Sequence, residues 1–134
     1  MSYKVMRSVE GKPWVALDGE PPFCVALDAA PSSRELELSE GWWLVMVFAA
    51  WNTSDINAIQ TALEASKGFG GTLHLGLRPF DDPEEHRAWC PDLSVGGDTP
   101  IWVLLKDGKA LLVRRGSVGV DEFVDSIKEK MRNE

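Results

Sequence analysis

Cysteine is scarce in this sequence, because only Cys24 and Cys90 occur among its 134 residues. They lie far apart and form neither a CxxC pair nor the ligand spacing of a zinc site. The two histidines, His74 and His86, have no third metal ligand at a useful spacing. We therefore expect two idle thiols in a reducing compartment, no bound metal and no cofactor.

Basic charge and long apolar runs are also lacking. Lysine and arginine total 14 against 21 aspartates and glutamates, which gives a formal net charge of −7. Such an acidic surface repels phosphate backbones, which disfavours nucleic acid as a partner, and it keeps a small domain soluble. No apolar run reaches the length of a membrane span, and residues 1–14 contain no apolar segment typical of a signal peptide. The sequence therefore predicts a cytoplasmic protein that binds neither nucleic acid nor membrane.

The composition is that of a globular protein, with 44% apolar and 26% charged residues. A chain of this length buries an adequate core as one domain. Two segments rich in strand-forming residues, 3–9 and 14–17, flank the turn sequence Gly11-Lys12-Pro13, a pattern typical of a β-hairpin. We therefore divide the chain into an N-terminal extension, residues 1–22, and one domain, residues 23–134.

Apolar periodicity predicts alternating strands and helices in that domain. Trp42–Ala50 is nearly all apolar, as expected for a strand buried on both faces. Asp107-Gly108 separates two apolar runs and is a strong hairpin signal. The predicted strands cover 23–27, 42–50, 72–77, 101–106 and 109–115, and the predicted helices cover 31–38, 52–67, 82–90 and 120–132. This order favours an α/β fold with a mixed central sheet, in which parallel βαβ units precede an antiparallel hairpin and helices cover both faces.

The helix after Trp51 carries clear starting signals. Asn52 is a favoured N-cap residue, and Asp55 stands where a capping box places its acid. Ile56, Ile59 and Leu63 then follow at helical spacing. We therefore expect residues 52–55 to form a well-capped helix start.

The chain resembles the thioredoxin-like superfamily from residue 23 to residue 132. In that family an apolar strand ends in tryptophan and a CxxC motif opens the next helix. Here the strand ends at Trp51, and the next four residues are Asn52-Thr53-Ser54-Asp55. Further positions match the family at its spacing: the helix-entry proline (Pro83), the cis-proline pair (Thr99-Pro100), the polar turn (Lys106-Asp107-Gly108) and the glycine after the last strand (Gly116).

This resemblance implies that the usual chemistry is lost. Dithiol exchange needs an attacking thiolate and a second thiol that resolves the mixed disulfide. Asn52 and Asp55 occupy the two cysteine positions, and Met46 occupies the position of the family's buried acid. We therefore expect a redox-inactive protein without dithiol enzyme activity.

The resemblance further implies a peptide-binding groove. The residue before the cis-proline, here Thr99, pairs its backbone with an extended peptide in the family. Trp51 supplies an aromatic platform, although packing in the core is an alternative role for it. Pro100 either shapes the groove or maintains the fold. The candidate binding residues are Trp51, Asn52, Thr53, Thr99, Pro100 and Gly116.

Our leading functional hypothesis is a polypeptide-binding accessory, adaptor or chaperone-like module with a protein or peptide partner. One alternative is an atypical thiol-disulfide or glutathione-dependent oxidoreductase that uses Cys90. Neighbouring Trp89 and the acids upstream disfavour a thiolate there. A second alternative is a small-molecule-binding or structural domain, because a fold alone does not determine function.

Overall fold

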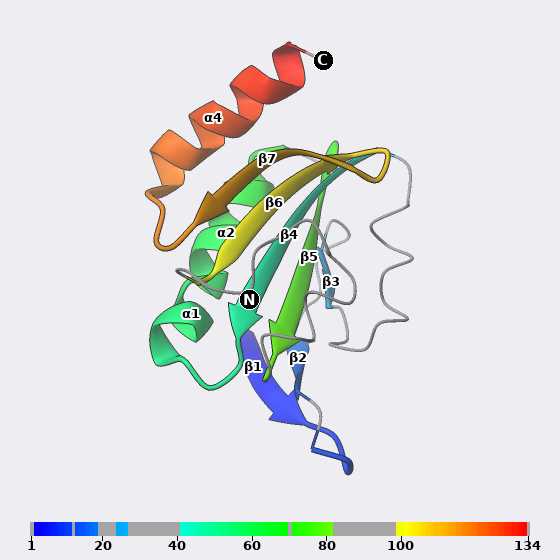
Figure 1. Ribbon diagram of the computed structural model, residues 1–134, viewed down its shortest axis with the longest axis vertical. Coiled ribbons are helices and arrows are strands. Elements are labelled where there is room, and N and C mark those ends of the chain that lie inside the picture. The colour runs from blue at the N-terminus through cyan, green and yellow to red at the C-terminus, as the bar shows by residue number, and fades with distance from the viewer. Residues whose placement is uncertain are drawn as a thin grey trace.

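A five-stranded mixed sheet forms the centre of the protein (Figure 1). The computed structural model describes residues 2–11, 13–18, 24–26, 41–69, 71–81 and 99–133. β4 is parallel to β5, which is parallel to β3, whereas β6 is antiparallel to both β4 and β7. The predicted mixed α/β sheet is thereby confirmed. In spatial order the strands are β3 (Cys24–Ala26), β5 (Leu73–Phe80), β4 (Trp42–Ala49), β6 (Ile101–Lys106) and β7 (Lys109–Arg115).

Strand β4 is buried on both faces, as its sequence predicts. Leu44, Met46 and Phe48 join a core cluster that includes residues from the helices. Trp43 and Val45 point to the opposite face and belong to a second buried cluster. Because side chains alternate along a strand, an all-apolar strand needs cover on both sides of the sheet.

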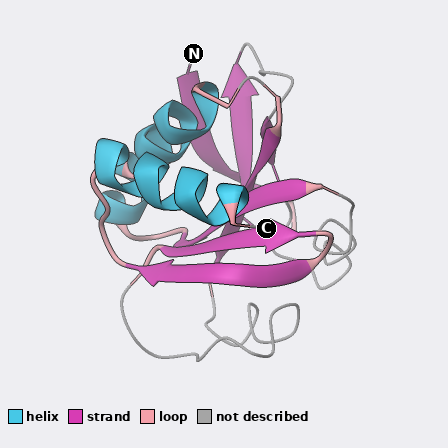
Figure 2. Cartoon of the chain, turned by 90° about the horizontal axis from the view of Figure 1, so that it is seen from above, coloured by secondary structure: helices cyan, strands magenta, loops and turns pink. Residues whose placement is uncertain are grey.

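The described helices gather on one side of the sheet (Figure 2). They are α1 (Thr53–Asn57), α2 (Ile59–Lys67) and α4 (Val120–Arg132). The helices predicted over 31–38 and 82–90, together with Pro83, His86 and Cys90, lie outside the described residues. The expected helical layer on the second face therefore stays a prediction.

The single helix expected after Trp51 is interrupted at Ala58, which separates α1 from α2. The Ala58 N–H is shared between the carbonyls of Ser54 and Asp55, both at 3.1 Å. Such sharing tightens the backbone locally toward the 3₁₀ form. Ile59 and Leu63 of α2 still reach the core, so the predicted apolar stripe holds across the interruption.

The terminal hairpin of β6 and β7 turns at Asp107 and Gly108, as predicted. Both have positive φ, 51° and 83°, which suits the tight turns that match strand twist. The turn is also tied to the start of β4. The Asp107 N–H donates to the Gly41 carbonyl at 3.0 Å, and the Gly41 N–H donates to Asp107 Oδ1 at 2.7 Å.

The predicted N-terminal hairpin consists of β1 (Ser2–Arg7) and β2 (Pro13–Asp18), which form a separate antiparallel sheet. A lone two-stranded hairpin is marginally stable in water, so contacts with the rest of the protein are needed to stabilise it. Val15 is buried in the core cluster on the helix side. Arg7 donates to both carboxylate oxygens of Asp81, at 2.6 and 2.8 Å, which fastens the hairpin to the chain just beyond β5.

Helix α4 is held to the sheet by Phe123, which is buried and packs edge-on against Trp102 with ring centroids 5.2 Å apart. We expect Phe123→Ala to lower the free energy of unfolding by about 3–5 kcal/mol, because it removes a buried aromatic ring and leaves a cavity. Urea denaturation followed by circular dichroism measures the change. Asp125→Ala, at an exposed position on the same helix, should stay within about 0.5 kcal/mol of the wild type. Equal effects of the two substitutions would show that α4 is not anchored by this ring.

Candidate binding site at the end of strand β4

The strand register brings three segments of the chain together at one end of the sheet. Val47 of β4 lies opposite Ile101, and Ile101 lies opposite Arg115. The residues that follow β4, precede β6 and follow β7 therefore meet at the same end. The Gly116 N–H confirms this closeness by donating to the Pro100 carbonyl at 2.9 Å. The structure thus brings the predicted positions around residues 51, 100 and 116 to one edge.

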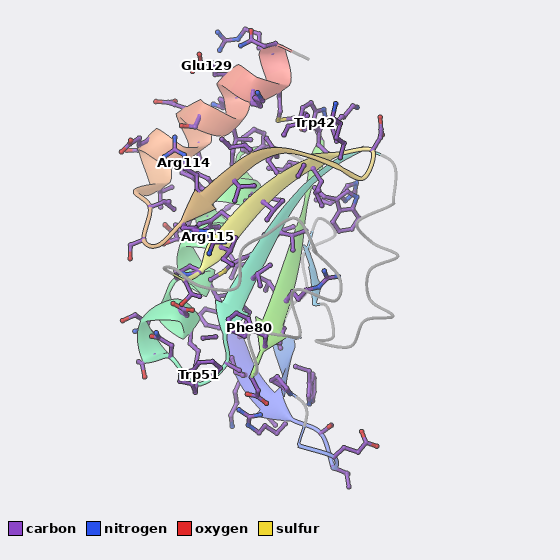
Figure 3. All side chains as sticks on the ribbon, viewed as in Figure 1. Trp42, Trp51, Phe80, Arg114, Arg115 and Glu129 are labelled. Atoms are coloured by element: carbon purple, nitrogen blue, oxygen red, sulfur yellow. The ribbon has the colours of Figure 1, made fainter. Side chains whose placement is uncertain are left out.

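Trp51 projects from this edge and is 58% exposed. Its ring meets Phe80 edge-on, with centroids 5.7 Å apart and an interplanar angle of 87° (Figure 3). The Ala50 N–H donates to the Phe80 carbonyl at 2.9 Å, which holds the backbone beside the ring. Trp51 is therefore a supported surface residue, and the alternative role in the core is wrong.

Asn52 caps α1 as predicted. Its Oδ1 accepts hydrogen bonds from the backbone N–H groups of Ser54 at 2.9 Å and Asp55 at 3.3 Å. The first N–H groups of a helix have no partner within the helix, so a side-chain oxygen at this position stabilises the helix start. Thr53, the next predicted binding residue, is the first residue of α1 and is exposed.

The capping-box role predicted for Asp55 is wrong. Asp55 is only 1% exposed, and its Oδ2 accepts from the Ala49 N–H at 2.9 Å instead of bonding to the N-cap residue. The Asn52 N–H donates to the Ala49 carbonyl at 3.2 Å. The carboxylate therefore ties the helix start to the end of β4 and fixes the turn that presents Trp51. The sequence pattern of the helix alone gave no signal for this contact.

Thr99, Pro100 and Gly116 lie at the same end of the sheet as Trp51. The Thr99–Pro100 peptide bond is cis, and Pro100 is buried while Thr99 is half-buried. Gly116 has a φ of 85°, a backbone conformation that favours glycine. Its carbonyl accepts a hydrogen bond from Trp102 Nε1 at 2.9 Å, which ties this turn to the core.

The described residues at this end of the sheet include no cysteine and no histidine. Met46 is fully buried among apolar side chains. Cys24 lies on β3 and is separated from β4 by β5, and Cys90 lies outside the described residues. His74 stacks on Trp43, with ring centroids 4.9 Å apart. Within the described ranges, no cluster of histidine, cysteine and acidic residues has the arrangement of a metal site.

Comparison with protein-family models found no match, and comparison with curated proteins found none either. None of the helices in the part of the chain that the structure describes has the length and apolar character needed to span a membrane.

The Asp55 contact can be tested by measuring unfolding. We expect Asp55→Ala to cost about 1–3 kcal/mol, because the buried Ala49 N–H loses its acceptor. Asp55→Asn keeps an acceptor oxygen of the same shape and should cost less. Asn57→Ala, at an exposed position of α1, is the matched control. If Asp55→Ala and Asn57→Ala are equally stable in urea denaturation, the carboxylate does not fix this turn.

Proposed function

We propose that the chain is a redox-inactive thioredoxin-like protein that binds an extended polypeptide segment and serves as an accessory, adaptor or chaperone-like module. The observation that carries this proposal is the exposed Trp51, supported by Phe80, at the edge where three segments of the chain converge. A large aromatic side chain held in place offers much contact area at a small cost in conformational entropy, and tryptophan is enriched among the residues that dominate binding energies.

The architecture supports the family part of the proposal. Parallel strands β4 and β5 precede the antiparallel pair β6 and β7, as the resemblance implies. A capped helix begins directly after the tryptophan at the end of β4. The Thr99–Pro100 pair directly precedes β6, where the resemblance places it.

The binding mode we propose is strand addition beside Trp51. The register of β4 and β6 brings Thr99 near the last residues of β4, so a peptide paired with the Thr99 backbone would run past the tryptophan ring. Gly116 has no side chain that would block the approach of the peptide. Apolar side chains of the peptide would contact Trp51, while backbone hydrogen bonds would supply affinity that is independent of sequence.

Replacing Trp51 tests the groove directly. We expect Trp51→Ala to reduce recovery of a bound partner about tenfold, because it removes the central aromatic contact. The measurement is affinity capture from the native host with quantitative mass spectrometry. Trp14→Ala, at an exposed tryptophan of the N-terminal hairpin, is the matched control and should retain the partner. If no protein depends on Trp51 for its recovery, the groove proposal fails.

The redox-inactive part of the proposal has a separate test. We expect the purified protein not to accelerate reduction of insulin disulfides by dithiothreitol, because residues 52–55 contain no thiol. Cys90→Ser should leave capture of the Trp51-dependent partner unchanged. Acceleration that is abolished by Cys90→Ser would instead establish the thiol enzyme considered as an alternative.

A further inference from the structure

A second candidate site lies at the other end of the sheet from Trp51. A surface depression of about 500 Å³ opens between the end of α2 and the last turns of α4. Thr72, in its lining, directly precedes β5, and β5 runs parallel to β4, so this depression and the end of β4 are at opposite ends of the sheet. The depression is shallow and largely open to solvent. The lining residues are Gly68, Phe69, Thr72, Lys128, Met131 and Arg132.

The lining combines an apolar base with positive charge. Phe69 and Met131 are half-buried and pack against the core cluster on the helix side. Lys128 and Arg132 are exposed and stand four residues apart on α4, so they share one face of the helix. None of the six described lining residues is acidic, although the chain as a whole carries a net charge of −7. The depression is therefore a locally basic site on an acidic protein.

Hydrogen bonds tie the backbone of Phe69 to Ser66 and Thr72. Its N–H donates to the Ser66 carbonyl at 3.1 Å. Its carbonyl accepts from both the N–H and the Oγ1 of Thr72, at 3.0 and 2.6 Å. These contacts hold the backbone that carries the ring, and a backbone that is ordered before a ligand arrives lowers the entropic cost of binding.

Basic residues at the end of α4 also complement the helix dipole. That explanation accounts for the position of Lys128 and Arg132 along the helix. It does not account for a depression in whose lining Phe69 and Met131 stay partly open to solvent.

We propose that this depression binds a small amphipathic anion, a carboxylate with an apolar tail. The tail would lie against Phe69 and Met131, where it removes apolar surface from water. The carboxylate would accept charge-assisted hydrogen bonds from Lys128 and Arg132. A cation with the same tail would be repelled, and an alcohol with the same tail would lack the charged contacts.

The test is a titration of the ¹⁵N-labelled full chain with octanoate, monitored by amide chemical shifts. We expect saturable shifts at Gly68, Phe69 and Thr72. Replacing both Lys128 and Arg132 by glutamine should weaken octanoate binding about tenfold, the effect of removing charge-assisted contacts. Lys130→Gln, on the same helix but outside the lining, removes a positive charge and should leave the affinity unchanged.

Octanol and octyltrimethylammonium are the matched ligands, with the same tail and a neutral or positive head. Equal affinity for all three would show an unspecific apolar patch, and an absence of saturable shifts with octanoate would remove the site altogether. An equal loss of affinity in Lys130→Gln would show that net charge alone attracts the anion. Each of these outcomes overturns the proposal. Trp51→Ala should leave octanoate binding intact, so this test is independent of the polypeptide groove.

Discussion

Strand β4 must lie in the middle of the sheet. Its side chains from Trp43 onward are shielded from water only when other strands pair with both of its edges and other residues cover both of its faces. It pairs with β5 on one edge and with β6 on the other, and both of its faces join buried clusters. Each large apolar side chain that is fully buried contributes about 1.5–3 kcal/mol. The positions of β5, β6 and the helices follow from the need to cover this one strand.

The same constraint explains why Trp51 lies at the surface. The strand ends at Ala49, and the chain must leave the core to begin α1. Asn52 and Asp55 use their side-chain oxygens to stabilise this exit, one for the helix start and one for the end of β4. These two side chains therefore stabilise the turn, and Trp51, which precedes them, stays exposed.

Local patterns predicted the features that depend on local chemistry. The cap at Asn52 and the turn at Asp107 and Gly108 are confirmed because each rests on conformational preferences of a few neighbouring residues. The partner of Asp55 was predicted wrongly, since its acceptor oxygen bonds to the strand at Ala49 and not within the helix. The sequence does not predict the interruption between α1 and α2, because the apolar stripe continues across it. The depression between α2 and α4 depends on how two distant helices pack, which periodicity does not encode.

The ion pair between Arg7 and Asp81 joins residues 74 positions apart in the sequence. The two strands of the N-terminal hairpin are close neighbours in the chain, so they can pair as soon as both have left the ribosome. Their docking must wait until β5 and Asp81 have been synthesised and folded, because these provide the surface on which the hairpin rests. During that interval Val15 has no core to enter, and the nascent hairpin presents its apolar face to the cell.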